Sequence, residues 1–280
     1  MFDCITLGMS GDVNLIQSRL YGHPECVFPI TIFKDDDTES VTYIEFKPKD
    51  DLFVLDRYVN VVAEYIIDRY EMGFLRKIIE EKYKELSVVA KREILKNAER
   101  LADDSEVGYH ARKQSVLLSI YDYLQEDCTM LIDGFVAFRL KDYEMLLEKL
   151  AERLVEQYVA HKEYEEFVDL LKYFVNIQSP RPQMIHVVVK EGGGYRIVNH
   201  QGEDITSRCF SDFVESVALL TEEAYDDLLI SVLITLAPME ITVHHRKKIQ
   251  NHELFSTITQ VFGGQIRYCD GCPICEKGEA

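Results

Sequence analysis

Two stretches near the start of the chain alternate apolar and polar side chains, which is typical of half-buried β-strands. They are CVFPITIF (residues 26–33) and VTYIEFK (residues 41–47), and the acidic turn KDDDTES joins them. DCITLGM (residues 3–9) predicts another strand, and residues 11–22 predict a short helix closed by a glycine. The pattern therefore predicts a small mixed α/β unit over residues 1–49.

From residue 50 onward, apolar residues recur every three or four positions, which indicates helices with one buried face. Further helices are predicted over residues 87–101 and 107–124, and another ends near residue 175. The helix expected after Asp133-Gly134 carries the most regular apolar stripe, which consists of Tyr143, Leu147, Leu150, Leu154 and Tyr158, and the helix YEEFVDLLKYFV that ends near residue 175 is expected to be a separate one. Residues 50–178 are thus expected to form a helical bundle.

The proline-containing segment SPRP (residues 179–182) ends this helical pattern, because proline lacks the amide hydrogen that a helix needs. MIHVVVK, a glycine turn and YRIVNH then predict a β-hairpin, and helices are expected over residues 211–220 and 222–237. The chain closes with a strand (residues 239–245), a helix capped by Asn251, and a strand (residues 265–269). Residues 183–280 are therefore predicted to be a C-terminal α/β unit, and the whole chain an α+β protein.

The chain is strongly acidic, with 31 Lys and Arg against 49 Asp and Glu and a formal charge of −18. Such a surface disfavours non-specific binding to nucleic acids and to anionic membranes, which leaves proteins as the expected partners. The most apolar window, residues 228–239, is shorter than the roughly 20 residues of a membrane span. The first residues lack the features of a signal peptide, so we expect a cytoplasmic protein with reduced cysteines. The oligomeric state is not predicted.

Three of the seven cysteines, Cys269, Cys272 and Cys275, lie at three-residue steps near the C-terminus. If the two closing strands are parallel neighbours, they end at the same edge of the sheet, which brings these thiols towards His244 and His245. Strand alternation allows only one of the two histidines to face the thiols. Thiolates and imidazole are preferred ligands of zinc, so the pattern predicts a Cys₃His site that contains one of the two histidines.

Other interpretations of these cysteines remain open. An iron–sulfur cluster would need a fourth cysteine, such as Cys4 or Cys26. A redox C-x-x-C pair normally opens a helix, and Pro273 predicts that no helix follows Cys272. Chemically inert thiols on a short tail are the third alternative.

Other polar groups give weaker signals. His186 and His200 belong to the hairpin and are expected to be ordinary core or surface residues. The carboxylate pair Asp226-Asp227 fits a helix start. Three consecutive glycines before a strand are typical of a hairpin and not of a phosphate-binding loop. The sequence contains no serine-nucleophile elbow, H-E-x-x-H, Walker loop or G-x-G-x-x-G.

The stretches LIDGFVAFRLKDYEMLLEKL, KEYEEFVDLLKYFV and GGYRIVNHQGEDIT, with the cysteine-containing end, resemble the YtxC-like sporulation proteins of endospore-forming bacteria. The G-F-x-x-F-R-L run at residues 134–140 is the most specific part; in it Phe135 and Phe138 are expected to be core residues and Arg139 a salt-bridged support. The resemblance implies a sporulation-associated protein of undefined activity, and it supplies no catalytic residues.

Two hypotheses follow from the sequence. The first is a non-catalytic interaction or regulatory protein whose C-terminal unit is held by structural zinc through Cys269, Cys272, Cys275 and His244 or His245. The second is an enzyme, either a metal-dependent hydrolase with an open coordination position or a thiol oxidoreductase. Whether the protein is an enzyme is left open, with the first hypothesis favoured.

Overall fold

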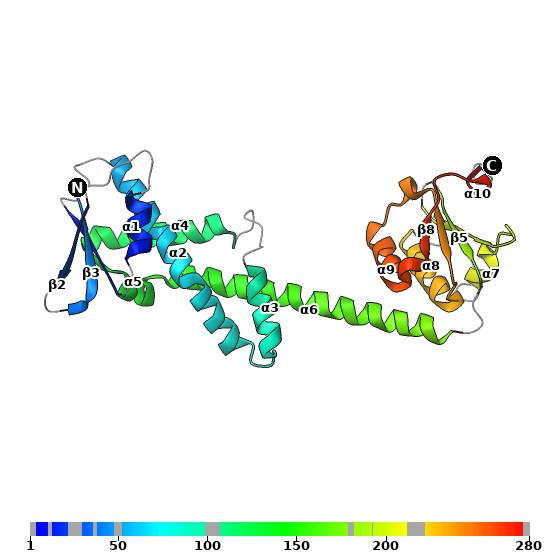
Figure 1. The fold of residues 1–280 in the computed structure, drawn as a ribbon, viewed down its shortest axis with the longest axis horizontal. Helices are drawn as coiled ribbons and strands as arrows, with labels where there is room; N and C mark the ends of the chain where they lie inside the picture. The colour runs from blue at the N-terminus through cyan, green and yellow to red at the C-terminus, as the bar shows by residue number, and fades with distance from the viewer. Residues whose placement is uncertain are drawn as a thin grey trace. The chain divides into compact units, whose positions relative to one another are not determined.

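The computed structural model places the predicted helices and strands in an α+β fold, coloured along the chain in Figure 1. It forms two compact units, residues 1–159 and 160–280. The sequence-based division instead separates residues 1–49 from the helices that follow. In the structure, side chains from the N-terminal strands and these helices share one core. The structure describes residues 4–10, 13–21, 30–35, 38–47, 52–98, 107–178, 182–191, 193–211 and 222–276.

The first unit contains a four-stranded sheet in the order β2-β3-β1-β4. Its strands are β1 (Ile5–Ser10), β2 (Ile30–Asp35), β3 (Thr38–Phe46) and β4 (Thr129–Leu131). β3 pairs antiparallel with both β1 and β2, which confirms the predicted hairpin, whereas β4 pairs parallel with β1. β4 was not predicted, because three residues are too few to show an alternating pattern.

The first unit also contains helices, the last of which, α6, continues into the second unit. They are α1 (Asn14–Tyr21), α2 (Leu52–Lys82), α3 (Val88–Ala98), α4 (Tyr109–Glu126), α5 (Ile132–Arg139) and α6 (Lys141–Ile177). The sheet packs against α2, where the rings of Phe46 and Tyr58 stack with centroids 4.0 Å apart. α6 is one continuous helix instead of the two that were predicted, because no proline or glycine interrupts it.

Of the two phenylalanines in the G-F-x-x-F-R-L run that were expected to be core residues, one is not. Phe135 is buried, but Phe138 is 76% exposed and is not a core residue. Both lie on the short helix α5, whose buried side chains are Ile132, Phe135 and Val136; because successive residues are turned by about 100°, position 138 lies to one side of that buried face. Arg139 has the expected support role, since it contacts Glu126 at 2.9 Å and lies over the ring of Tyr123.

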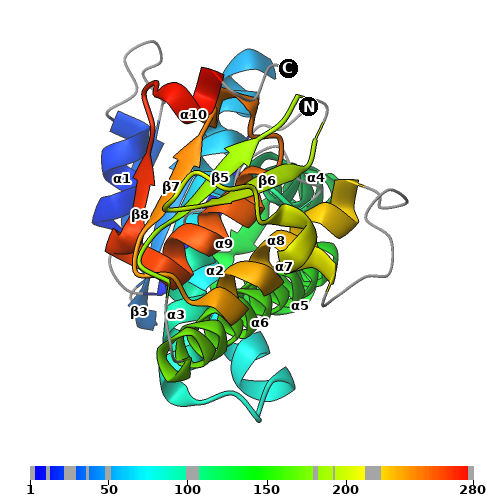
Figure 2. The ribbon, with the colours of Figure 1, turned by 90° about the vertical axis from the view of Figure 1, so that its right-hand side faces the viewer.

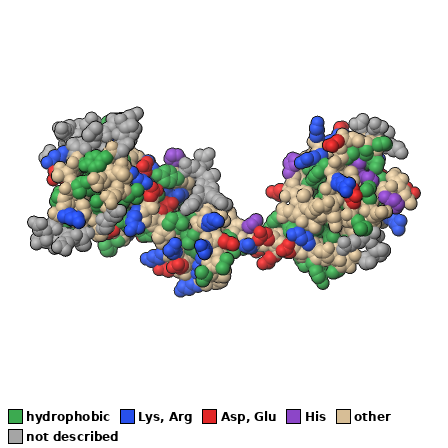
Figure 3. Space-filling view, in the orientation of Figure 1, with side chains coloured by type: hydrophobic (Ala, Val, Ile, Leu, Met, Phe, Trp, Pro, Cys, Tyr) green, Lys and Arg blue, Asp and Glu red, His purple; other side chains and the backbone are tan. Residues whose placement is uncertain are grey.

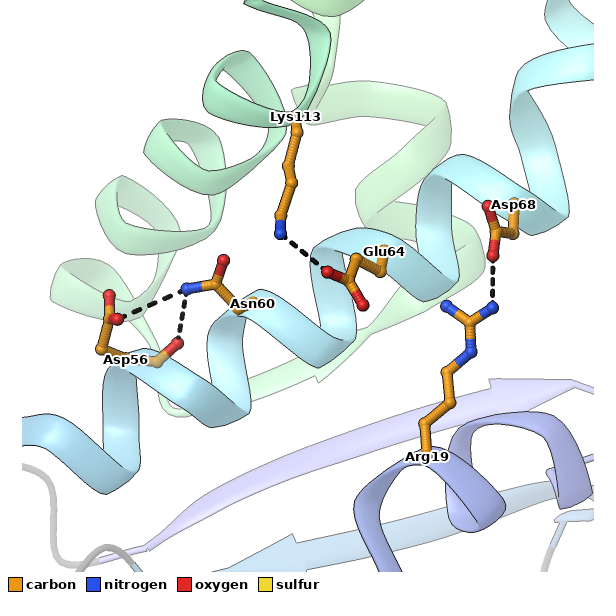
Figure 4. Close-up of polar contacts among 6 residues, drawn as sticks. All are labelled: Arg19, Asp56, Asn60, Glu64, Asp68 and Lys113. Atoms are coloured by element: carbon orange, nitrogen blue, oxygen red, sulfur yellow. Dashed lines mark hydrogen bonds and ion pairs between the residues drawn. The ribbon is translucent and has the colours of Figure 1, made fainter. Parts of the chain in front are cut away.

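Polar side chains follow one face of α2 at four-residue intervals (Figure 4). Asp68 accepts a hydrogen bond from Arg19 on α1, and Glu64 accepts one from Lys113 on α4 at 2.7 Å. Asn60, on the same face, donates to the backbone carbonyl of Asp56 at 2.9 Å. These acidic positions have structural partners on neighbouring helices, so they do not indicate a cation site.

A buried ion pair lies deeper between α2 and α4. The guanidinium of Arg112 donates two hydrogen bonds to Glu71, at 2.8 and 3.0 Å, and another to the carbonyl of Val107. The hydroxyl of Tyr143 on α6 donates to the same carboxylate at 2.7 Å. Every charged atom of the pair therefore has a partner, which is the condition for burying such a pair without a large penalty.

The second unit contains a four-stranded sheet in the order β6-β5-β7-β8. Its strands are β5 (Ile185–Val189), β6 (Tyr195–Asn199), β7 (Ile241–His244) and β8 (Ile266–Tyr268). β5 and β6 form the predicted antiparallel hairpin, and β7 runs parallel to both β5 and β8. The accompanying helices are α7 (Thr206–Ser211), α8 (Glu222–Leu236), α9 (His252–Phe262) and α10 (Pro273–Glu276), drawn in Figure 2. The helix predicted over residues 211–220 lies almost wholly outside the described residues.

The two faces of this sheet have different surroundings. One face packs against α8, α9 and the last turns of α6 in the main core of the unit, and it carries the side chains of Ile185, Val187, Ile197, Ile241 and Val243. By alternation, His186, Val188, Thr242 and His244 point to the opposite face. Val188 and His244 are nevertheless buried. Because α8, α9 and α6 pack on the other face, these helices do not account for the burial of Val188 and His244.

Candidate metal centre

The β7–α9–β8 connection brings the end of each strand to the same edge of the sheet. The side chain of Asn251 accepts a hydrogen bond from the amide of Leu254 and caps α9, as predicted. Gly263, with φ of 55°, ends the helix in a conformation that favours glycine. β7 and β8 are parallel, with Val243 opposite Tyr268. The expected convergence of His244 and Cys269 is therefore present.

After β8 the chain turns back across the strand ends. The amide of Cys269 donates to the carbonyl of Val243 at 2.9 Å, which extends the pairing by one step. Gly271, with φ of 143°, makes the turn. Pro273 then opens the one-turn helix α10, which lies beyond the carboxyl ends of β5 and β7 in Figure 2. The prediction that no helix follows Cys272 is wrong, because proline is well suited to the first position of a helix.

These turns bring four potential ligand atoms together. The Nδ1 atom of His244 lies 3.3 Å from Sγ of Cys275 and 3.4 Å from Sγ of Cys272. Sγ of Cys275 lies 3.9 Å from Sγ of Cys269 and 3.8 Å from Sγ of Cys272. All four atoms lie within 4.8 Å of one another. This spacing fits one metal ion at their centre.

The other predicted ligands are placed elsewhere. His245 follows the end of β7 in a left-handed conformation, with φ of 57°, and is not part of the group. Cys4 lies in the first unit, beside Glu45 on the neighbouring strand. Cys26 lies outside the described residues. The structure thus selects His244 from the two adjacent histidines.

The local environment keeps His244 neutral. Burial, together with the positive charge that His186, His245 and Arg196 would place nearby, lowers the pKa of His244 to about 4. A neutral imidazole is the form that binds a metal ion. In the absence of a metal, His244 is therefore ready to coordinate at neutral pH.

The thiols differ from one another. Burial and the neighbouring Cys269 and Cys272 thiols raise the pKa of Cys275 to about 11. For Cys272, burial opposes ionisation, but hydrogen bonds from the amides of Cys275 and Ile274 outweigh it and lower the pKa of this thiol. Cys272 therefore ionises more readily than Cys275, and the thiolate is the form that binds a metal ion.

Two contacts of the centre were not predicted from the sequence. Nδ1 of His186 on β5 lies 3.0 Å from Nε2 of His244, on the side of the ring away from the thiols. Nη2 of Arg196 on β6 donates to the carbonyl of Ile274 in α10 at 3.3 Å. Both residues face the same side of the sheet as His244. This follows from the strand register, because Val188 pairs with Arg196 on one side and with His244 on the other. The sequence alone does not give that register.

The remaining candidates have structural explanations. His200 directly follows the end of β6, away from the centre, and it is not one of the four grouped ligands. Asp226 accepts hydrogen bonds from the hydroxyl of Tyr195 and from the side-chain amide of Asn251. Gly193 and Gly194 have positive φ angles in the hairpin turn, as expected for a turn and not a phosphate-binding loop.

Comparison with known proteins identifies the family. The sequence model of the YtxC-like family matches residues 57–267, three quarters of the chain. The chain belongs to the YtxC-like family. The curated Bacillus subtilis (strain 168) protein named "Uncharacterized protein YtxC" is 24% identical over 236 residues, which cover 81% of this chain and 82% of that protein. No solved structure matches this YtxC-like chain. None of its described helices is both long enough and apolar enough to span a membrane.

Proposed function

We propose that this protein is a non-catalytic interaction or regulatory protein whose C-terminal segment is held in place by one structural zinc ion. The observation that carries the proposal is the convergence of His244, Cys269, Cys272 and Cys275 on one point. The donor set is the Cys₃His type that structural zinc sites use.

The donor spacing supports a single zinc ion. A tetrahedral ion with Zn–S bonds of about 2.3 Å places neighbouring sulfurs about 3.8 Å apart, and a nitrogen at about 2.0 Å lies roughly 3.5 Å from each sulfur. The sulfur–sulfur distances of 3.8 and 3.9 Å and the nitrogen–sulfur distances of 3.3 and 3.4 Å are close to these values. An iron–sulfur cluster needs room for several irons and sulfides between its ligands, which donors within 4.8 Å do not leave.

The ligand count supports a structural role. Catalytic zinc sites provide three protein ligands and keep a fourth position for water or substrate. Here four protein atoms occupy the four corners of the site, and His244, at 1% exposed, is closed to solvent. The hydrolase alternative would require one of these ligands to leave.

The surface of α6 supports an interaction role. Towards its C-terminal end, apolar side chains at helical spacing are exposed: Phe167, Leu170, Tyr173, Phe174 and Ile177. A contiguous exposed apolar stripe is typical of a surface that binds another protein. Acidic side chains gather along the middle of the same helix (Figure 3), which disfavours a nucleic acid as the partner. The proposal also includes a cytoplasmic location, expected from the absence of signal-peptide features, and a role in sporulation, which the family resemblance implies.

Cobalt substitution tests the structural assignment. Co²⁺ in the metal-free protein should give the intense d–d absorption of a tetrahedral thiolate site, and added azide should leave the spectrum unchanged because no position is open. A His245→Asn variant should give the same spectrum, whereas a His244→Asn variant should not. A spectrum that shifts with azide would favour the hydrolase.

A thiol oxidoreductase is the second candidate, since the Cys272 thiol has a lowered pKa and lies 3.8 Å from Cys275 at the start of α10. Metal-free protein should then catalyse dithiol–disulfide exchange on a model disulfide, and Cys272→Ser should abolish this activity. We expect no such turnover once zinc is bound, because the thiolates are then occupied as ligands.

A further inference from the structure

His186 lies directly behind the candidate zinc ligand His244. Its Nδ1 atom is 3.0 Å from Nε2 of His244, and the two ring centroids are 5.2 Å apart with a tilt of 48° between the planes. The residues come from adjacent parallel strands, where His186 pairs with Thr242, two residues before His244. Side chains two positions apart on neighbouring strands point to the same face of the sheet.

The contact fixes which nitrogen carries the proton. An imidazole that binds a metal ion through Nδ1 keeps its hydrogen on Nε2. The Nδ1 atom of His244 is the one that faces the thiols, so its Nε2–H must point at His186. For a hydrogen bond to form, Nδ1 of His186 must then be an unprotonated acceptor.

We infer that His186 is the positioning residue of the metal centre: it accepts the Nε2–H hydrogen bond of His244 and so holds Nδ1 in the coordinating tautomer and orientation. The inference rests on the proposed zinc site and adds a residue that contacts one of the four ligands and not the metal ion itself. Metal-binding histidines generally need such an outer partner, and loss of that partner typically weakens metal binding 10- to 100-fold.

The choice of a histidine acceptor fits the charge of the site. Three thiolates and one Zn²⁺ leave a net charge of −1 beside the buried His244. A carboxylate at position 186 would place a second negative charge against the site, and unpaired buried charge is costly. A neutral imidazole supplies the acceptor without that charge.

The test combines two variants with a matched control. His186→Leu removes the acceptor and keeps an apolar side chain, whereas His186→Gln returns an amide oxygen that can accept the hydrogen bond. His200→Leu removes a histidine elsewhere in the same hairpin. Zinc affinity is measured by competition with a chromophoric chelator. We expect His186→Leu to bind zinc 10- to 100-fold more weakly than wild type, His186→Gln to recover most of the loss, and His200→Leu to match wild type.

Long-range ¹H–¹⁵N NMR of zinc-loaded wild-type protein gives an independent readout that does not depend on how well a variant folds. His244 should show a protonated Nε2 and a metal-bound Nδ1. Binding through Nε2, or unchanged affinity in His186→Leu, would overturn the inference while leaving the zinc site intact. Failure of wild-type protein to bind any zinc would overturn the proposed function, and the inference with it.

Discussion

Removing the metal should release residues 269–276 while the sheet beneath them stays folded. The segment has few contacts of its own. Its hydrogen bonds to carbonyl oxygens include Cys269 to Val243 and Cys275 to Cys272, both at 2.9 Å, and Arg196 to Ile274 at 3.3 Å. The amides of Gly271, Ile274 and Cys275 also donate to thiol sulfurs within the segment, which are weaker acceptors. The main core of the unit, which includes β5 and β7, contains no residue of this segment.

The magnitudes indicate how much free energy the proposed metal ion would contribute. Ordering the backbone of this short segment costs roughly 1–2 kcal/mol per residue, or about 10 kcal/mol altogether. The three hydrogen bonds contribute about 1 kcal/mol each, and partial burial of Ile274 adds roughly 1 kcal/mol. The remaining deficit of about 6 kcal/mol is smaller than the roughly 10–16 kcal/mol that a structural zinc ion supplies, so one bound zinc ion would be enough to order the segment.

Hydrogen–deuterium exchange measured by mass spectrometry, with and without a chelator, tests this prediction. Peptides that cover residues 269–276 should lose protection when the metal is removed, whereas peptides from β5 should stay protected. Cys269→Ser/Cys272→Ser should behave like chelated wild type and should not respond to chelator. Unchanged protection of residues 269–276, or equal loss of protection throughout the sheet, would refute the reasoning.

Three further predictions concern stability. Arg112→Met should cost about 3–5 kcal/mol, because Glu71 is left as an uncompensated buried charge, whereas the exposed Arg139→Met should cost less than about 1 kcal/mol; chemical denaturation followed by circular dichroism compares them, and similar costs would contradict the assignment. In metal-free protein the pKa of His244 falls from 6.5 to about 4 on folding, so between these pH values the unfolded chain binds a proton that the folded chain does not. The free energy of unfolding therefore decreases as pH falls from 6.5 towards 4. Chemical denaturation of His244→Gln should show a smaller decrease over that interval, and an identical pH dependence would count against the lowered pKa. Asn251→Ala should cost about 1 kcal/mol through loss of the α9 cap, which thermal melts measure, and an unchanged melting temperature would argue against that cap.

Local patterns predicted much of the fold because they follow from short-range physics. The alternation in β1 and β3 and the three-to-four spacing in α2 report burial directly. The β7–α9–β8 unit could be predicted because its helix is capped and both strands are apolar. β4 could not be predicted, since its three residues are defined only by pairing with β1. The exposure of Phe138 depends on how the short helix α5 is oriented, which its sequence does not encode.

For the candidate metal centre too, some features could be predicted from the sequence and others could not. Cys269, Cys272 and Cys275 share a spacing that is visible in the sequence. The choice of His244 over His245 depends on where β7 ends, and a left-handed residue at position 245 settles it. His186 gave no signal as part of this site, because its contact with His244 comes from the register of β5 against β7, set by pairing between segments more than fifty residues apart.

Metal content tests the central claim most directly. Untagged protein purified without chelators, and its Cys269→Ser/Cys272→Ser variant, would be analysed by inductively coupled plasma mass spectrometry. The proposed Cys₃His site predicts about one zinc ion per wild-type chain and almost none in the variant. Absence of metal from both proteins, or equal zinc in both, would contradict the claim.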